Sequence, residues 1–543
     1  MLLRLLAIGV RFVLMIDRKK FLALALSSAF IFVSAAVAEK RGEPLEFTIL
    51  HTNDLHSHDL PFKDNGQKIG GLPRIVSLIE SFRKKVPHTV TIDSGDIFEG
   101  TPFFTYYHGA VEVGLLNDAH YDIYTIGNHE FDDGPVNLAK QLKMAKFDII
   151  NCNMDTSAYP QLQALIKPSV IKTIDGQKVA FIGAICPDLA NVTYRSEKVK
   201  VINADGDWMS PIRDEIARVK KEGIDKIVLV THVGVDRDRL LAQLADVDVI
   251  IGGHSHTRLD EPIIVEHADG SHCVVVQTGC YGRALGKLNL HFDGAGRVDT
   301  SKIGYKLFEI TKQLPSDKNI EKALEKKAQP FKALEKEVLA TATDKFDNVW
   351  LSHMGDSALG NLITDALADG GAKYGATIAM ENRGGMRAAI QKGEISAEDV
   401  EELLPFANTL VVATVTGDDL RKVLEVSVGG NKERSIVLGA QFLDVHGLKF
   451  EWDPEAKPMD RIRNLSALNS SGAYEPVKPD GKYRLAINDY AFEVEGFDFT
   501  RATNVVNTKT RLSVFLHDYL LKQMTVTPKE EGRIVPLGKN TGK

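Results

Sequence analysis

Short runs of β-branched and apolar residues alternate with amphipathic stretches from residue 45 to about residue 310. Eight of these runs are strand candidates, at residues 47–52, 89–94, 123–128, 147–152, 179–185, 226–232, 247–253 and 273–279. Between them, residues 71–86 and 210–223 place apolar side chains at helical spacing, and Gly223 provides a C-terminal stop. This alternation predicts an α/β domain.

The pattern changes after residue 313. Residues 314–345 form a charged run rich in Lys, Glu and Ala with Pro330 in the middle, which predicts a helical linker. We expect a first domain over residues 39–313 and a second over residues 346–543, with its own mixture of helix and strand. Thirteen of the sixteen histidines precede residue 315, so any histidine-based chemistry belongs to the first domain.

The first 38 residues have the layout of a secretory signal peptide. Residues 17–20 are charged, residues 21–38 carry no charge, and the run ends in Ala-Val-Ala. We expect cleavage after Ala38, and Met15 would serve as a start as well as Met1. An uncleaved membrane anchor is the alternative, because about 18 apolar residues reach the lower limit for spanning a bilayer.

Charge and cysteine content narrow the location and the partners. The chain has a net charge of −7 and lacks the basic surface of a duplex nucleic-acid binder. No later stretch is apolar enough to span a membrane, so we expect a periplasmic or secreted protein with no stable membrane insertion after signal cleavage. For the four cysteines, buried thiols and one or two disulfides are both open. Cys273 and Cys280 flank a strand-like run that, if straight, holds their α-carbons too far apart to bridge.

Five polar clusters lie at the C-terminal ends of predicted strands. They are Asn53-Asp54-Leu55-His56, Gly95-Asp96, Gly127-Asn128-His129-Glu130, Thr231-His232 and Gly252-Gly253-His254-Ser255-His256. Strand ends of an α/β sheet share one edge, so the clusters can converge there. Imidazole and carboxylate groups are good ligands for Zn, Mn, Fe or Co, and residues two apart point to the same side of an extended segment. One such cluster is more often a turn or a helix cap, but five in this order predict a metal site.

The series D-x-H, G-D, G-N-H-E, T-H and G-H-S-H resembles the calcineurin-like metallophosphoesterase signature. The sequences HTNDLHSH, GNHEFD and QTGCYGRALGKL narrow the resemblance to the 5'-nucleotidase family, which includes bacterial periplasmic UDP-sugar hydrolases and 2',3'-cyclic nucleotide phosphodiesterases. It covers essentially the whole chain after the signal peptide. It implies a four-layer α-β-β-α metallophosphoesterase sandwich, the catalytic domain, followed by a separate α+β domain that binds the nucleotide.

The resemblance also implies two divalent metal ions and their ligands. Asp54, His56 and Asp96 would hold one ion, with His256 nearby. Asp96, Asn128, His232 and His254 would hold the other, so that Asp96 bridges the two. The metal stays open among Zn, Mn, Co and Fe, and some relatives have Gln or Asn in place of His256.

Hydrolysis of a phosphate ester also needs help for the leaving alkoxide. His129 adjoins the expected ligand Asn128, and its imidazolium could stabilise the transition state or protonate the leaving oxygen. Asp132, three residues on, can reach the far ring nitrogen and fix the tautomer, and the family uses this pair in the same way. The alternatives are that His129 is a further metal ligand and that Asp132 is a helix N-cap.

Substrate recognition needs positive charge for phosphate and aromatic rings for a base. In the sequence NRGGMR, glycines let the backbone approach an anion and arginines supply forked donors. It resembles the family's substrate loop, with Asn382 and Arg387 at matching positions and Arg383 as a further donor. The resemblance further implies that Phe406 and Tyr490 are the aromatics that stack on the base and that Asp498 is the ribose-binding aspartate. The alternative for the NRGG loop is a surface turn, and the alternative for Phe406 and Tyr490 is packing in a core.

These features predict an exported dinuclear-metal phosphoesterase that hydrolyses nucleoside 5'-monophosphates to nucleoside and phosphate. UDP-sugars and 2',3'-cyclic nucleotides are further candidate substrates. The alternatives are a hydrolase of a non-nucleotide ester, of the thiosulfohydrolase kind, and a two-domain periplasmic solute-binding protein. His353 stands where the family usually has a phosphate-binding arginine, which leaves the preferred substrate open.

Overall fold

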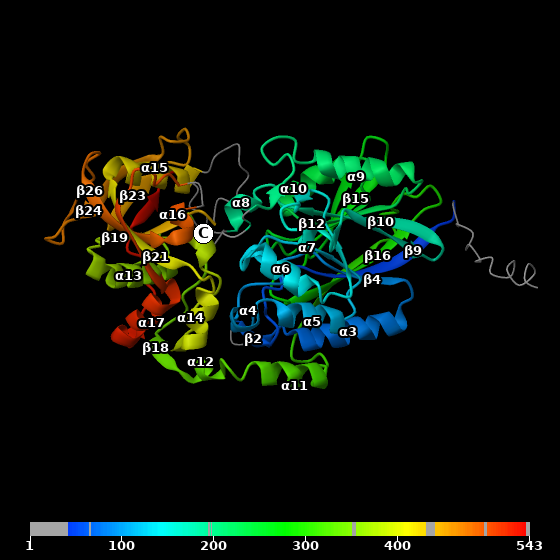
Figure 1. Ribbon diagram of the computed structural model, residues 1–543, viewed down its shortest axis with the longest axis horizontal. Helices are drawn as coiled ribbons and strands as arrows, with labels where there is room; N and C mark the ends of the chain where they lie inside the picture. The colour runs from blue at the N-terminus through cyan, green and yellow to red at the C-terminus, as the bar shows by residue number, and fades with distance from the viewer. Residues whose placement is uncertain are drawn as a thin grey trace, which may run out of the picture.

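The computed structural model describes residues 42–64, 67–193, 196, 198–349, 354–429, 440–493 and 497–538. The expected signal peptide and His353 lie outside the described residues. Figure 1 shows two units, which are joined through the helices α11 (Lys318–Lys327) and α12 (Lys332–Lys336). Among the residues that the structure describes, no helix is both long enough and apolar enough to cross a membrane.

The first unit contains a seven-stranded sheet in the order β17-β16-β1-β4-β5-β6-β8. Its strands are β1 Leu45–Thr52, β4 Thr89–Asp93, β5 Ile123–Thr125, β6 Asp148–Ile150, β8 Ile166–Lys167, β16 Ala284–Phe292 and β17 Gly304–Glu309. The strands β1, β4, β5, β6 and β8 run parallel, whereas β16 pairs antiparallel with β1 and β17 pairs antiparallel with β16. The parallel strands therefore end at one edge, where the polar clusters follow.

A six-stranded sheet in the order β14-β15-β13-β12-β10-β9 completes this unit. Its strands are β9 Ser169–Ile174, β10 Gln177–Ile185, β12 Ile227–His232, β13 Val249–Ile251, β14 Ile263–Glu266 and β15 His272–Val276. The central four strands are parallel and the two edge strands are antiparallel. These strands are almost continuously apolar, as expected for a sheet covered on both faces.

The two sheets pack face to face, and helices cover both outer faces. Apolar side chains of β1 and β4 meet those of β10, β12 and β13 between the sheets. The helices α3 (Leu72–Lys85), α5 (Ala110–Asp118) and α6 (Gly134–Leu142) pack on the first sheet, and α9 (Ser210–Lys221) and α10 (Val235–Leu241) on the second (Figure 1). The expected four-layer α-β-β-α sandwich is thus confirmed.

The second unit is built on a five-stranded sheet in the order β22-β19-β26-β21-β27. Its strands are β19 Ile378–Asn382, β21 Thr409–Thr416, β22 Leu443–His446, β26 Lys482–Asn488 and β27 Thr503–Arg511. The helices α13 (Ala358–Gly371), α14 (Ala397–Leu403) and α17 (Leu512–Gln523) pack against one face. Helix α15 (Gly417–Gly429) and a second sheet, β25-β24-β23-β29, cover the other.

The remaining elements are short. They are β2 Phe62–Asp64, β3 Gln67–Ile69, α4 Pro102–Tyr107, η1 His129–Phe131, β7 Met154–Asp155, α7 Pro160–Gln163, α8 Leu189–Val192, β11 Lys200–Val201, η2 Ala372–Tyr374, η3 Arg383–Gly385, α16 Asp489–Glu493, β23 Leu448–Trp452, β24 Ile462–Leu468, β25 Tyr474–Pro476 and β29 Ile534–Pro536.

Residues 338–342 belong to the second unit although the sequence placed them in the linker. They form the strand β18 (Val338–Ala342), which pairs with β20 (Gly393–Ser396) and β28 (Thr525–Val526). The partners are distant in sequence, so the local pattern gave no sign of the pairing. We propose that the linker is the shorter segment 314–337.

All four cysteines lie within the described residues, and all four are free thiols. Cys186 and Cys273 are buried, and Cys152 and Cys280 are half-buried. Of the two alternatives left open by the sequence, the structure supports the one without disulfides.

Candidate active site

The polar clusters leave the strands through left-handed turns. The backbone φ angle is 51° at Asp54, 47° at His56, 57° at Asp96, 78° at His254 and 52° at His256. We expected the pair Asp54 and His56 and the pair His254 and His256 to lie on extended segments, and this expectation is wrong. Non-glycine residues in this conformation are strained and cluster at functional sites, and here the turns bring the side chains back over the sheet edge.

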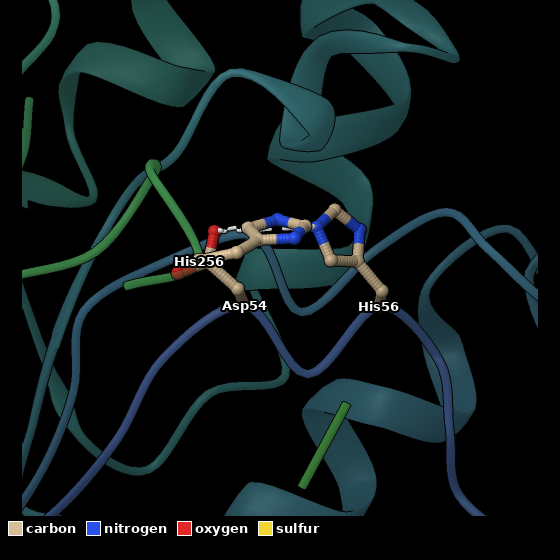
Figure 2. Close-up of side chains that lie close together, drawn as sticks. All are labelled: Asp54, His56 and His256. Carbon is tan, nitrogen blue, oxygen red and sulfur yellow. Dashed lines mark hydrogen bonds and ion pairs between the residues drawn. The ribbon is translucent and has the colours of Figure 1, made fainter. Parts of the chain in front are cut away.

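Asp54, His56 and His256 form the first group of candidate ligands (Figure 2). The Nε2 atom of His256 lies 3.3 Å from Oδ1 of Asp54 and 3.0 Å from Nε2 of His56. Asp54 and His56 come from the loop after β1, and His256 comes from the loop after β13. Residues 200 positions apart therefore point donor atoms at one place.

Asp96, His232 and His254 form the second group. The Nε2 atom of His232 lies 2.9 Å from Oδ2 of Asp96, and Nδ1 of His254 lies 2.8 Å from Oδ1 of Asn128. Asp96 also lies 3.9 Å from Nε2 of His56 through the same Oδ2 atom. Its carboxylate therefore stands between the two groups, where the sequence predicted a bridge.

The hydrogen bonds of these imidazoles leave lone pairs facing the carboxylates. Nδ1 of His232 lies 2.6 Å from the carbonyl oxygen of Ser94, and Nδ1 of His56 lies 3.2 Å from that of Phe98. A carbonyl only accepts, so Nδ1 carries a hydrogen in each ring, and in the neutral ring that a metal binds Nε2 offers its lone pair. The buried Nε2 atom of His232 faces the carboxylate of Asp96, at 2.9 Å. This donor set fits divalent cations.

Glycines keep the space around these groups open. A β-carbon on Gly127 would lie 2.2 Å from Oδ1 of Asp96, and one on Gly253 would lie 2.9 Å from Nδ1 of His232. Both distances are shorter than real contacts of such atoms. The glycines of these motifs are therefore needed to let the backbone approach the candidate ligands.

Glu130 connects two of the strand-end loops, whereas the sequence left open whether it supports the ligands or is solvated. Its buried carboxylate accepts hydrogen bonds from the backbone N–H groups of Asp96, Ile97 and Gly127, at 2.9, 2.8 and 2.6 Å. Burial raises the pKa of Glu130 to about 7, and the charge of Asp96 adds to the shift. Burial would also raise the pKa of Asp96, yet the imidazoles of His232 and His129 hold it well below its usual range.

His129 and Asp132 lie beside the two groups. The Nδ1 atom of His129 is 2.7 Å from Oδ2 of Asp132, which leaves Nε2 for other contacts. The backbone N–H of His129 donates to Oδ1 of Asp96 at 2.8 Å. The alternative that Asp132 caps a helix is wrong, since Asp133 holds the N-cap position of α6. The group of His56, Asp96 and His129 also lies within 4.8 Å, so the ligand alternative for His129 stays open.

A cavity of about 310 Å³ lies between the two units and is lined by residues of both. Ten of the residues singled out in the sequence line it, namely Asp96, Asn128, His129, Asp132, His254, His256, Asn382, Arg387, Phe406 and Tyr490. Asp54, His56 and His232 lie beneath it, within the two groups of candidate ligands. The fold therefore brings together side chains from both units around one space.

The second unit reaches directly to the candidate ligands. Nη2 of Arg387 lies 3.3 Å from Nε2 of His56, and the hydroxyl of Tyr281 donates to the carbonyl of Arg387 at 3.1 Å. The ring of Phe406 stacks on that of His129 at 5.5 Å. The hydroxyl of Tyr490 donates to the carbonyl of Asn191 in the first unit. Phe406 and Tyr490 therefore line the cavity and do not pack in a core.

Arg383 does not reach the cavity, contrary to the expectation. Its guanidinium is 2% exposed and forms a two-pronged ion pair with Asp444, with Nε–Oδ2 and Nη2–Oδ1 distances of 2.9 and 2.7 Å. It also donates to the carbonyl of Gly355 at 2.6 Å. The buried Asp444 is the reason, because a charge removed from water needs a partner.

Asp498 is exposed and also lies away from the cavity lining. Its carboxylate accepts from the backbone N–H and the hydroxyl of Thr500, at 3.1 and 2.6 Å. Its neighbours Phe497 and Phe499 are buried in the second unit's core. Alternation along an extended segment turns Asp498 outward, so the structure does not bring it to the site.

Two family models match the chain. The calcineurin-like phosphoesterase model matches residues 47–258, and the model of the 5'-nucleotidase C-terminal domain matches residues 338–501. The chain is 30% identical to a 5'-nucleotidase-related protein of Glossina morsitans morsitans, over 94% of this chain and 98% of that protein. It is 28% identical to the 5'-nucleotidase of Mus musculus, over 95% and 94%.

Other similarities differ in extent. The trifunctional nucleotide phosphoesterase protein YfkN of Bacillus subtilis is 28% identical over 90% of this chain, which spans only 35% of that protein. The structure of a 5'-nucleotidase precursor from Thermus thermophilus superposes with a TM-score of 0.85 at 30% identity, over 91% of this chain and all of that one. The sulfate thiohydrolase SoxB shares the fold, with a TM-score of 0.75 at 17% identity.

Proposed function

Because the chain belongs to the 5'-nucleotidase family and is a metal-dependent phosphoester hydrolase, we propose that it releases phosphate from nucleoside 5'-monophosphates. Nucleotide phosphoesters are the substrate class of the relatives whose names state one. One observation supports a nucleotide as the substrate. Four of the candidate ligands, the pair His129 and Asp132, and the rings of Phe406 and Tyr490 all line one cavity of about 310 Å³, and the other candidate ligands adjoin those four.

We assign two divalent ions to this site. Asp54, His56, Asp96 and His256 would hold one, and Asp96, Asn128, His232 and His254 the other. The Nε2 atoms that face the carboxylates, the closeness of these donor atoms to one another and the glycine-lined space support this assignment. Ions bound there would supply Lewis acidity toward the phosphoryl oxygens and make water a better nucleophile at neutral pH.

The remaining chemistry belongs to side chains of this protein. Asp132 holds Nδ1 of His129, which stabilises the protonated ring and directs the Nε2 proton to the leaving oxygen. Arg387 offers its guanidinium to the phosphoryl oxygens beside His56. Phe406 and Tyr490 enclose the base, and Asn382 lines the same space.

The amide of Asn382 is held in one orientation. Nδ2 of Asn488 donates to Oδ1 of Asn382 at 2.8 Å and to Oε2 of the buried Glu381 at 2.9 Å. Oδ1 of Asn488 accepts from the backbone N–H of Ala491 at 2.6 Å, next to Tyr490 in α16. Asn488 thus ties the loop of Asn382 to the helix of Tyr490, which supports a binding role for both.

We further propose that residues 1–38 direct export and that the mature protein acts in the periplasm or outside the cell. The order of charged, apolar and small residues supports the first point. Names among the relatives support the second, since one is a snake venom 5'-nucleotidase and one structure is of a 5'-nucleotidase precursor.

A substrate panel tests the proposed activity. The purified protein is freed of metal with a chelator, reloaded with Mn, Zn, Co or Fe, and assayed on AMP, UDP-glucose and 2',3'-cyclic AMP. We expect phosphate release from AMP that the chelator abolishes and at least one metal restores, with about two ions bound per chain. Hydrolysis of non-nucleotide esters without hydrolysis of AMP would favour the thiosulfohydrolase alternative, whose only structural support is the shared fold of SoxB.

A further inference from the structure

The segment after β10 contacts three parts of the candidate site. It comprises Asp188, the short helix α8 (Leu189–Val192) and Thr193, and it lines the cavity from the side of the first unit. None of these residues belongs to the motifs that predicted the site. The contacts are made by consecutive residues of one short segment.

Thr193 contacts the carboxylate that orients His129. Its hydroxyl donates to Oδ1 of Asp132 at 3.0 Å, while Oδ2 of the same carboxylate lies 2.7 Å from Nδ1 of His129. Thr193 is 2% exposed, and the side chain of Asp132 is 14% exposed. Both oxygens of Asp132 therefore have a fixed partner, and the carboxylate cannot rotate without losing one of them.

The two preceding residues contact other parts of the site through their carbonyls. The carbonyl of Val192 accepts from Nδ2 of Asn128 at 3.2 Å, which turns the Oδ1 atom of Asn128 toward His254. The carbonyl of Asn191 accepts from the hydroxyl of Tyr490 in the second unit. The backbone position of Thr193 is thus tied to a candidate ligand and to the substrate-binding unit.

We propose that Thr193 is a positioning residue for phosphoester hydrolysis. Its hydroxyl holds Asp132 so that Oδ2 stays on Nδ1 of His129, and His129 keeps Nε2 directed at the substrate. This inference rests on the role proposed above for His129, and it assigns to the segment after β10 a task that no motif contains. Without the hydroxyl, Oδ1 of Asp132 loses its hydrogen-bond donor. The carboxylate can then rotate, so that Oδ2 moves away from Nδ1 of His129.

The geometry predicts an effect on turnover and little effect on binding. Partners of this kind typically contribute about 10- to 100-fold to activity when they orient a reacting group. Thr193→Val keeps the shape of the side chain and removes the hydroxyl. We expect kcat to fall about 10- to 100-fold with KM changed less than about threefold, because the groups proposed to bind phosphate and base are untouched.

The experiment compares Thr193→Val with Thr193→Ser and with a matched control. Thr173→Val makes the same chemical change on the exposed face of β9, away from the cavity lining. Steady-state kinetics are measured on AMP and on 4-nitrophenyl phosphate, with metal content and thermal unfolding recorded for each variant. We expect Thr193→Ser to retain at least half of the wild-type kcat and Thr173→Val to be unchanged.

A double-mutant cycle with His129→Ala separates positioning from a general structural role. His129→Ala alone should lower kcat by about 10²- to 10⁴-fold. If Thr193 acts through His129, adding Thr193→Val should lower kcat by less than about twofold more, since residues that act as a unit are not additive. Full additivity, or failure of Thr193→Ser to rescue, would overturn the proposal.

The two substrates keep this result separate from the proposed function. Hydrolysis of 4-nitrophenyl phosphate without hydrolysis of AMP would refute the nucleotide substrate, and the cycle would still be decided on 4-nitrophenyl phosphate. Hydrolysis of AMP with an unchanged kcat in Thr193→Val would refute the role of Thr193 alone. A large loss in Thr193→Val with no loss in His129→Ala would also overturn the inference.

Discussion

Arg383 and Arg387 lie four positions apart in one loop, yet the fold gives them opposite tasks. Arg387 reaches 3.3 Å from His56 in the other unit, whereas Arg383 turns inward to the buried carboxylate of Asp444. From the sequence alone both arginines suited an anion. What separates them is a carboxylate 61 positions away, since a buried charge without a partner costs several kcal/mol.

Arg383 is therefore expected to matter for stability. Arg383→Met leaves the carboxylate of Asp444, which is 1% exposed, without its charged partner. We expect the free energy of unfolding in a denaturant titration to fall by about 3 to 5 kcal/mol, with KM for AMP unchanged.

The matched control for this change is Arg213→Met. Arg213 pairs with Asp207 on the surface, where water already solvates both charges, so no measurable loss of stability is expected. If Arg383→Met instead raised KM for AMP and left stability unchanged, Arg383 would have the phosphate-binding role that the sequence predicted.

At the scale of elements, the strands end at one edge of the sheet, and the turns that follow them bring the candidate ligands together. The predicted strands at residues 123–128 and 247–253 end earlier in the structure, at Thr125 and Ile251. The residues released from the strands form tight turns with glycine at the closest approaches. Gly127 makes the closest approach to the side chain of a candidate ligand, because its missing side chain leaves room for the carboxylate of Asp96.

Gly127→Ala tests this use of space. Its β-carbon would meet Oδ1 and the backbone nitrogen of Asp96 at 2.2 and 2.6 Å, so the carboxylate or the turn must shift. We expect loss of bound metal, measured by elemental analysis, and a fall in kcat of at least about 100-fold, since a misplacement of about 1 Å costs that much.

Gly114 provides the control for this substitution. It lies in α5 with open space around its α-carbon, and Gly114→Ala should leave metal content and kcat unchanged and stability equal or slightly higher. Full metal content and activity in Gly127→Ala would show that the site tolerates the shift and that the spacing argument is wrong.

Across the whole molecule, each unit donates a tyrosine hydroxyl to a backbone carbonyl of the other. Tyr281 of the first unit bonds Arg387, and Tyr490 of the second bonds Asn191. Arg387, Asn191 and Tyr490 line the same cavity. The two bonds connect the two units at the place where the proposed substrate would bind.

Tyr490→Phe tests the contribution of the hydrogen bond between Tyr490 and Asn191. The ring for stacking remains, and only the bond to Asn191 is removed. A neutral hydrogen bond contributes about 0.5 to 1.5 kcal/mol net, so we expect KM for AMP to rise about 2- to 10-fold. Tyr474→Phe, on β25 far from the cavity lining, serves as the control. An unchanged KM in Tyr490→Phe would mean that the bond does not contribute to the substrate-bound state.

Much of the site can be predicted from the sequence because the pattern that marks a strand end is local. Strand ends are visible as apolar runs that stop at polar residues, and parallel strands share an edge whatever packs around them. The five polar clusters could therefore be named before their distances were known, and the family resemblance picked out of them Asp54, His56, Asp96, Asn128, His232, His254 and His256. His129 and Asp132 followed because a spacing of three residues brings two side chains together within one turn.

The sequence by itself determined which residues are available at the sheet edge and that two units share the work. The tertiary structure alone decided how they are used: that Glu130 joins two loops, that Asp444 withdraws Arg383, that Asp498 faces outward and that Thr193 holds Asp132. Each of these except Asp498 depends on a partner 32 or more positions away. Such contacts exist only once the chain has folded, because their partners carry no local periodicity or spacing that would identify them.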